Sequence, residues 1–397
     1  MYDYIIVGAG IAGLYTAYRL VSHNRFVKLL LLEKRSQVGG RAGTELFYDV
    51  PVAIGAGIGR KKKDKRLLQL LNTMQIQVSY YKIKKQHVGF DDVNLVKVLK
   101  YLQKEWKKEY KLHPFDTSFK TFAQHKLGVD TYNRFILTSG YSDYEHENVW
   151  SALFHYGMDD NADSWKAFFV PWGVLESKLL HHIGAHRIET NKTVVNIEGS
   201  LQTGFEVTTS TLQVFYAKQV ILASTIGTVQ RLVAHKNLRF QPLLDKIQSQ
   251  PFLRVYGKFS VTSAPIVQHH VPTFTIVTGP LQKIIPIQPD KGVYMICYND
   301  NQHAQLLIDN VADTEDNRQY FCHLFRQALG IPEELELEGI KGYYWKEGTH
   351  YYRERPLPTE RVQSDQGITI VGELISTNQG WVEGALESVD NIMDFIS

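Results

Sequence analysis

The sequence is poor in cysteine and has no apolar run long enough to cross a membrane. Its 397 residues include only Cys297 and Cys322, with no CxxC pair and no cluster of metal-ligand spacing. These absences exclude a disulfide framework and argue against a metal site, and they indicate a reducing compartment. The first expected strand begins at residue 2, which leaves no room for a targeting peptide. We therefore expect a cytoplasmic protein without a membrane anchor.

The sequence also lacks a large excess of one charge, since it contains 44 Lys and Arg residues and 41 Asp and Glu residues. Only the stretch 60–111 departs from this balance, with fifteen basic residues against five acidic ones. No stacking aromatics or nucleic-acid motifs are interleaved with these charges, so we expect a solvated helical face and no nucleic-acid partner. The length and the 44% hydrophobic content are typical of a globular protein with two domains.

What the sequence does contain is a glycine motif at its start. The expected strand 2–7 runs into the sequence GAGIAG at 8–13 and then into a helix. Gly8 permits a tight turn, Gly10 leaves the backbone open to a pyrophosphate, and Gly13 lets the helix lie close to the strand. The N-terminus of that helix offers unpaired N–H groups and a positive dipole end to the phosphates.

The second expected strand, 27–32, ends at an acidic residue. Glu33 follows Gly13 by twenty residues, where a carboxylate can accept hydrogen bonds from both ribose hydroxyls of an adenosine. The same charge repels a 2′-phosphate, which disfavours an NADP-type ligand. Beyond it, the pair at 39–40 brings more backbone to the pyrophosphate, and Arg41 adds a planar cation. These features predict a dinucleotide site, and a nicotinamide-binding unit has no need of the second glycine pair.

A second glycine motif stands at the other end of the chain. The expected strand 368–371 runs into Gly372 and Glu373, and the sequence GWVEGA at 380–385 opens the last helix. A helix that starts there presents N–H groups near Val382 and a positive dipole end. Such groups stabilise the negative charge of a reduced flavin.

The two motifs, in this order, resemble the flavin-containing amine oxidase superfamily, which includes monoamine and polyamine oxidases, protoporphyrinogen oxidase and phytoene desaturases. The resemblance covers both ends strongly and the middle by the order of its elements. It implies non-covalent FAD, because no cysteine falls where covalent members attach the flavin. The cofactor contacts that it implies are Gly8, Gly10, Ile11, Ala12, Gly13, Glu33, Lys34, Gly39, Gly40, Arg41, Gly55, Ala56, Val195, Ala223, Gly372, Glu373, Trp381, Val382 and Ala385.

The resemblance also implies an α/β fold of two interleaved domains. A Rossmann-like FAD-binding domain, with a mostly parallel sheet and a β-meander, would take residues 1–60, 172–230 and 365–397. An α+β substrate domain of mixed sheet and helices would take 61–171 and 231–364. We expect the meander to comprise strands at 186–189, 194–198, 205–209 and 212–217, followed by a separate buried strand at 219–224.

The implied reaction is hydride transfer from an amine C–H to flavin N5, with O2 reoxidising the flavin to give H2O2. Trp381 would form one wall of an aromatic cage around the amine. Tyr351 is our candidate for the second wall, with His350 and Tyr352 as alternatives. Many members place a lysine, through a water, at N5. Lys258 and Lys283 are the candidates here and neither matches clearly, which puts efficient reoxidation by O2 in question.

Two other functions stay open. A desaturase or dehydrogenase of an apolar substrate would use the same cofactor in a more apolar pocket and would give no peroxide with amines. A flavoprotein without redox turnover, mutase-like or like the Rab-GDP-dissociation-inhibitor binding proteins, would share the fold, but a protein that abandons FAD has no reason to keep both motifs. The acidic and aromatic stretch 143–147 suits either a polyamine or a solvated loop.

Overall fold

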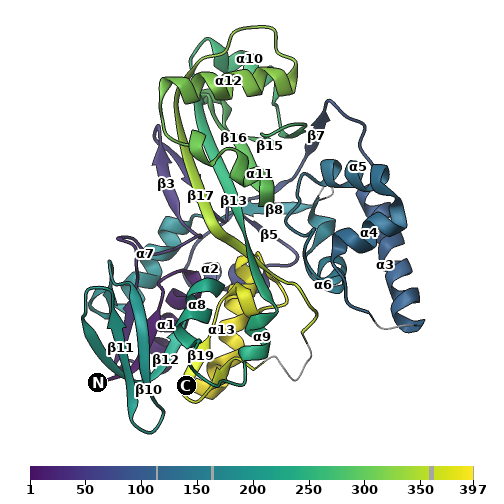
Figure 1. Cartoon of the computed structure of the whole chain (residues 1–397). Helices are drawn as coiled ribbons and strands as arrows, with labels where there is room; N and C mark the ends of the chain where they lie inside the picture. The colour runs from purple at the N-terminus through teal and green to yellow at the C-terminus, as the bar shows by residue number, and fades with distance from the viewer. Residues whose placement is uncertain (113–114, 162–164, 357–361, 397) are drawn as a thin grey trace.

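The computed structural model describes residues 1–112, 115–161, 165–356 and 362–396. Its elements gather into three regions (Figure 1). A Rossmann-like region carries both termini, a six-stranded sheet stands above it, and a lobe of helices formed by residues 95–154 lies to one side. No helix within the described ranges is long and apolar enough to cross a membrane.

The first sheet is built around five parallel strands. Their order is β9 (Ile188–Glu189), β2 (Leu29–Leu32), β1 (Tyr2–Val7), β12 (Val214–Leu222) and β19 (Ile368–Ile370). All residues of β2 and β19 are buried, and all except Thr369 are apolar. This pattern is typical of parallel strands that are covered on both faces. Val7 lies opposite Leu32, so the first glycine turn and Glu33 emerge at the same edge of the sheet.

The β-meander has three strands and differs from the expected one. β10 (Val194–Ser200), β11 (Gly204–Thr209) and the first half of β12 pair in antiparallel fashion. β9 lies outside the meander, because it pairs in parallel with β2 at the opposite edge. The expectation of separate strands at 212–217 and 219–224 was wrong: β12 is continuous and serves both the meander and the parallel sheet.

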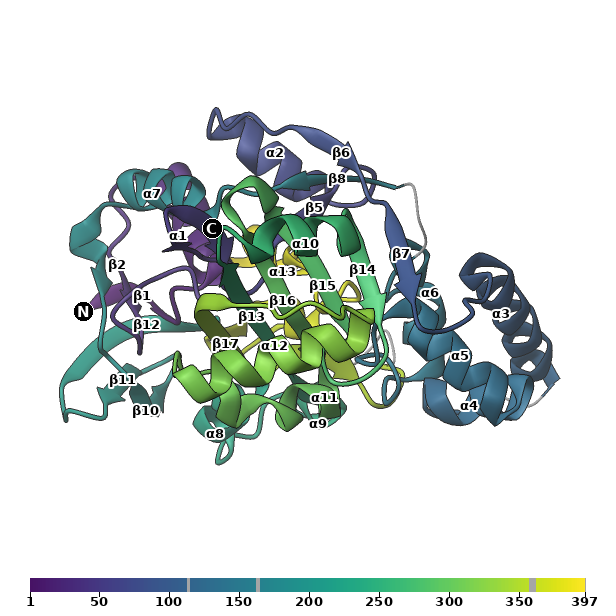
Figure 2. The same cartoon turned by 90° about the horizontal axis from the view of Figure 1, so that it is seen from above.

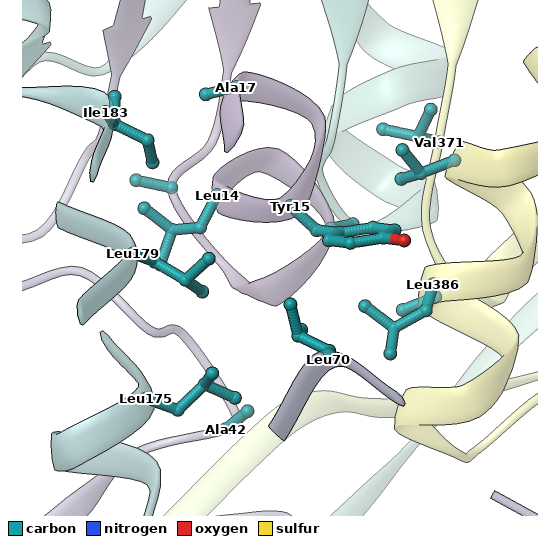
Figure 3. Close-up of a cluster of buried hydrophobic side chains, with 14 of the residues drawn as sticks. Leu14, Tyr15, Ala17, Ala42, Leu70, Leu175, Leu179, Ile183, Val371 and Leu386 are labelled. Carbon is teal, nitrogen blue, oxygen red and sulfur yellow. The ribbon is translucent and has the colours of Figure 1, made fainter. Parts of the chain in front are cut away.

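Helices cover both faces of this sheet. On one face, α1 (Ile11–His23) is surrounded by α7 (Trp172–Ile183), α2 (Lys65–Thr73) and α13 (Val382–Ile396). On the other face, α8 (Ile226–Val233) and α9 (Gln241–Asp245) pack with the meander. Figure 3 shows the first core, where segments far apart in sequence meet around α1. The labelled side chains at its centre are Leu14 and Tyr15 of α1, Leu70 of α2, Leu179 of α7 and Leu386 of α13.

The second sheet is antiparallel except for its last strand pair. Its strands, in order, are β17 (Leu337–Tyr352), β13 (Ile247–Phe259), β16 (Val293–Asp300), β15 (Lys283–Gln288), β14 (Phe274–Val277) and β7 (Lys85–Val88). The long strands β13 and β17 descend from this sheet to the level of α13 (Figure 1). Helices α10 (Ser263–His270), α11 (Asn301–Leu306) and α12 (Glu315–Leu329) lie against the sheet, as the view from above shows (Figure 2).

The helical lobe has its own aromatic core, with Trp106, Phe119 and Tyr144 buried. The lobe consists of α3 (Leu95–Leu112), α4 (Phe119–Leu127), α5 (Val129–Ser139) and α6 (Val149–Phe154). Two small sheets link the regions: β3 (Thr44–Phe47) with β4 (Val50–Ala53), and β5 (Ile58–Arg60) with β8 (Lys166–Phe169) and β6 (Tyr80–Lys82).

Candidate functional site

The two N-terminal glycine loops meet at the start of α1. The Gly39 N–H donates to Ala9 O at 2.8 Å, and Gly10 forms an isolated bridge with Gly39. A Cβ added at Gly10 would meet only Gly39 O, at 4.0 Å, and one at Gly40 would meet only Gly10 Cα, at 3.3 Å. No side chain caps the helix at Gly10. The loops therefore leave an open cradle of backbone beside the free N–H groups of α1, including those of Ile11 and Ala12, which fits a pyrophosphate.

Gly8 and Gly13 serve the turn itself. Gly8 has φ +106°, and a Cβ there would lie 2.4 Å from Ala223 O at the end of β12. A Cβ on Gly13 would lie 2.0 Å from Gly8 O. The Ala223 N–H donates to Val7 O at 2.9 Å, which holds the ends of β1 and β12 together below the turn. These positions permit no side chain, so they are glycine for reasons of packing.

Glu33 has a structural role that its position in the sequence did not reveal. Its buried carboxylate accepts hydrogen bonds from the Ala9 N–H at 2.8 Å and the Arg35 N–H at 2.9 Å. It thus ties the end of β2 to the first glycine loop. Each carboxylate oxygen keeps a second lone pair, which a ribose hydroxyl can use. The neighbouring Lys34 is exposed to solvent.

Val195 lies at an irregularity in β10. Val194 pairs with Thr209 and Asn196 with Thr208, so Val195 has no residue opposite it in the ladder. Its side chain is 39% exposed. The start of this strand is near Glu33, because the Lys192 N–H donates to Glu33 O at 2.8 Å. The segment that leads into β10 and Val195 therefore passes beside Glu33 at the end of β2.

Glu373 is the centre of a polar network at the second motif. Its carboxylate accepts hydrogen bonds from Arg41 Nη1 and from the Gly380 N–H, both at 2.9 Å, and from His350 Nδ1. The Ile226 N–H donates to His350 Nε2 at 3.1 Å, so the proton of the ring lies on Nδ1 and faces Glu373. Burial opposes ionisation of Glu373, but His350, Arg41 and the Gly380 N–H outweigh it and hold its pKa at about 2.

Arg41 joins the two glycine motifs. Besides Glu373, its Nη1 donates to Gly348 O of β17 at 2.7 Å. Gly372, at the end of β19, donates its N–H to Ser388 Oγ of α13 at 2.8 Å. One guanidinium therefore links the N-terminal loop, the long strand β17 and the C-terminal motif.

The small-residue segment 53–57 packs on the second glycine loop. The Ala56 N–H donates to Arg41 O at 2.8 Å, and a Cβ on Gly55 would lie 2.0 Å from that oxygen. Ring side chains of β13, β17 and α7 fix the segment from the other side. Their hydrogen bonds run from Tyr256 to Ala53 O, from Trp345 to Ile54 O and from Trp172 to Ala56 O.

Trp381 stands directly before α13, which begins at Val382, and Ala385 is buried one turn later. The Arg60 guanidinium covers one face of the indole, 3.6 Å from the ring centre. Arg60 is itself paired with Asp64 and Asp160. A neutralised cation thus occupies one face of the Trp381 indole.

Tyr351 lies near the lower end of β17 and is partly buried. Thr349, on the same face of the strand, lies 3.7 Å from the Cβ position of Gly380, next to Trp381. The structure therefore brings the ends of the elements that carry Tyr351 and Trp381 together at Gly380. Within the described contacts, the two rings do not touch.

The two candidate lysines lie in different surroundings. Lys283 is fully buried in β15, its ammonium is paired with Asp300 at 3.1 Å, and the ring of Tyr141 lies 4.0 Å away. Lys258 is at the upper end of β13 and pairs with Glu338 at 3.1 Å. The charge of each lysine is therefore matched by a carboxylate.

The comparisons with known proteins agree with this arrangement. Residues 6–73 match the family model of an NAD(P)-binding Rossmann-like domain. Two variants of putrescine oxidase, from a structure-based redesign of its cofactor binding, superpose with TM-scores of 0.75 and 0.76 at 15% identity. Each superposition covers 100% of this chain and 98% of the other. The chain has the fold of putrescine oxidase. An uncharacterised protein of Acanthamoeba polyphaga mimivirus is 21% identical over 98% of this chain and 93% of its own length.

Within the putrescine oxidase fold, this chain has a buried arginine that the sequence reasoning missed. Arg254 of β13 is 7% exposed, and its guanidinium lies 4.5 Å from the ring centre of Tyr298. Its Nη1 lies 3.1 Å from the Cβ position of Gly57, at the end of the small-residue segment. The available signal was a single arginine that stands between the apolar residues Leu253 and Val255.

Proposed function

We propose that the protein is an FAD-dependent oxidoreductase of the amine oxidase type. The observation that supports this most strongly is the ion pair between Arg41 and Glu373, 332 residues apart, which ties the two glycine motifs into one site. A protein that bound a nicotinamide dinucleotide through its first motif alone has no use for that link. The putrescine oxidase fold is consistent with the proposal.

In this proposal FAD spans both motifs. Gly10 and Gly40 would hold its pyrophosphate, and Glu33 and Val195 would hold its adenosine. Glu373 would hold the ribityl chain, while Gly55, Ala56 and the start of α13 would hold the ring. The cofactor is non-covalent: both nitrogens of His350 already have partners, and both cysteines lie in the core of the second sheet.

Bound FAD would supply a hydride acceptor at N5, and O2 would serve as the oxidant that returns the flavin to its oxidised form and becomes H2O2. The work of the protein is orientation and electrostatics. Trp381 and Tyr351 hold the amine between aromatic surfaces, with one face of Trp381 fixed by Arg60. The N–H groups at the start of α13 stabilise the negative charge that the ring takes up. The predicted domain division places this chemistry where 1–60, 172–230 and 365–397 meet the rest of the chain.

The experiment is to record the absorption spectrum of the purified protein and then mix it anaerobically with a panel of mono-, di- and polyamines. We expect a flavin spectrum, bleaching by at least one compound, and recovery with H2O2 when O2 is admitted. A folded protein that takes up no FAD would contradict the whole proposal. A yellow protein that no amine bleaches would contradict only the amine oxidase and would favour the desaturase or the non-redox flavoprotein.

A further inference from the structure

We propose that Arg254 binds an anionic group of the substrate, so that the molecule oxidised carries a carboxylate as well as an amine. The oxidation itself rests on the proposed function above, whereas the anion site rests on the surroundings of Arg254. Amino acids and amines with a remote carboxylate are the substrate class that this site selects.

Among the described residues, no carboxylate pairs with the Arg254 guanidinium to balance its charge. Three Arg or Lys side chains are buried among the described residues: Arg60, Lys283 and Arg254. Arg60 pairs with two aspartates and Lys283 with Asp300, but no carboxylate of the described part of the chain pairs with Arg254. Its Nε is also a buried donor without a hydrogen-bond partner. An arginine stays charged at any working pH, so an uncompensated one is costly unless a ligand supplies the counter-charge.

The guanidinium is held in one position, as a binding site requires. The ring of Tyr298 lies beneath it at 4.5 Å, and Gly57 allows Nη1 to approach the backbone where any side chain would meet it at 3.1 Å. Arg254 shares a face of β13 with Tyr256, whose hydroxyl donates to Ala53 O at 2.6 Å. The segment that carries Gly57 is therefore fixed against the same strand, and the arginine fork is preorganised.

Arg254 is linked through β5 and β13 to the residues that we propose to hold the amine. β5 follows Gly57 directly, and three residues on, Arg60 stacks on Trp381. Gln250, on the same face of β13 as Arg254, is the register partner of Thr349, which lies against Gly380. β5 and one face of β13 therefore connect the Arg254 guanidinium with Trp381 and Tyr351, the proposed aromatic walls.

The acidic residues nearby do not take the place of a counter-ion. Asp143 accepts a hydrogen bond from the Tyr156 hydroxyl at 2.5 Å, and burial raises its pKa to about 7. Burial also raises the pKa of the Glu147 carboxyl well above its usual range. These groups are therefore weak attractants for an ammonium at neutral pH, whereas Arg254 keeps its full charge. The balance of buried charge favours a substrate anion over a second substrate cation.

The first test compares compounds that differ only by a carboxylate, such as cadaverine with lysine and phenethylamine with phenylalanine. In anaerobic flavin reduction we expect the acid of at least one pair to react at least tenfold more efficiently than its amine. Arg254→Met should abolish that preference and Arg254→Lys should retain part of it. If every reactive pair favours the plain amine, or if Arg254→Met keeps the preference for the acid, the anion site is wrong while the oxidase stands.

The second test needs no turnover, so it decides the inference even if no compound reduces the flavin. Benzoate is titrated against protein with and without FAD, and the unfolding temperature and the flavin absorption are followed. We expect benzoate to raise the unfolding temperature of the wild type and of Lys341→Met, a control on the adjacent strand whose lysine pairs with Glu45. Arg254→Met should fold at least as stably as the wild type and show no benzoate shift. Equal shifts in all three proteins would overturn the inference.

Discussion

Single glycines in the first motif have separable tasks, which allows the cofactor site to be tested without damage to the fold. Gly13 lies against Gly8 O, and its hydrogen atom is all that fits there. Gly10 instead faces open space, with φ −71° that any residue adopts. The fold itself requires a glycine at position 13, whereas only a ligand in the cradle requires one at position 10.

We therefore predict that Gly10→Ala folds but does not retain FAD. The new Cβ meets no protein atom closer than 4.0 Å, so the stability of the apo-protein should change by no more than about 1 kcal/mol, the scale of a changed helix cap. FAD affinity should fall at least 100-fold, because that Cβ occupies the space left for the pyrophosphate. Thermal unfolding and FAD fluorescence titration measure the two effects. Gly173→Ala, which meets nothing within 4 Å, is the control; unchanged FAD affinity in Gly10→Ala would remove the pyrophosphate from this cradle.

The ionisation of Glu373 makes a second residue-scale prediction. Its pKa is lowered from 4.5 to about 2 in the folded protein, so its contribution to stability is complete above pH 4.5 and is lost as pH falls toward 2. Glu373→Gln should cost roughly 3 kcal/mol of unfolding free energy at neutral pH. The gap between the two proteins should close between pH 4.5 and 2 in urea unfolding. A gap that stays constant with pH would show that the charge on Glu373 does not matter.

At this scale the glycines and Glu373 were predictable, because a motif of fixed spacing reports what the backbone must do. Arg254 was not, since a charged residue in a strand looks like a solvent-facing position until the neighbouring elements are known. The network of Glu33 with backbone N–H groups was hidden for the same reason. Its partners Ala9 and Arg35 become neighbours only when β1 and β2 pair.

Among the elements, the long strand β17 is the one whose absence from the sequence prediction mattered most. It contains three glycines and has no clean alternation of buried and exposed residues, so a period of two cannot be recognised in it. β9 has only two residues, and which edge of the sheet it joins depends on long-range pairing. By contrast α1, α2 and α12 were predictable, because each has one apolar face over several turns.

The start of α2 depends on a residue of the C-terminal motif. The N–H groups of Arg66 and Leu67 donate to the Glu383 carboxylate at 3.0 and 3.1 Å, and Asp64 provides no side-chain cap. Glu383→Ala should therefore cost about 2 kcal/mol, because two donors at a largely buried helix end lose their acceptors. Glu383→Gln keeps one acceptor oxygen and should cost less than half as much. Equal losses for the two variants in urea unfolding would mean that this contact is not a helix cap.

On the scale of the whole molecule, a buried charge cluster joins the helical lobe to the second sheet. Ser142 of the lobe donates to Asp300 of β16, which also pairs with Lys283. Asp143 lies beside this group, and burial raises its pKa from 3.8 to about 7. The unfolded chain therefore loses the Asp143 proton at lower pH than the folded protein does. The contribution of Asp143 to the free energy of unfolding is therefore complete below pH 3.8 and is lost as the pH rises to about 7.

Asp143→Asn should remove this loss, since the amide is uncharged and its oxygen still accepts from Tyr156. We expect equal stability of the two proteins near pH 4 and an advantage of about 1 to 2 kcal/mol for the variant at pH 8. This range is smaller than the shift alone implies, because part of Asp143 stays accessible to solvent. The exposed Asp130→Asn is the control. A wild type that is as stable as Asp143→Asn at pH 8 would contradict a raised pKa of Asp143 in the folded protein.

At the centre of the proposed function, two distant glycine motifs hold one FAD. The most direct measurement is a calorimetric titration of the apo-protein with FAD and, in separate experiments, with NAD+ and NADP+. We predict one FAD per chain with submicromolar affinity and at least 1000-fold weaker binding of either nicotinamide dinucleotide. Binding of NAD+ in preference to FAD by the folded protein would contradict the claim.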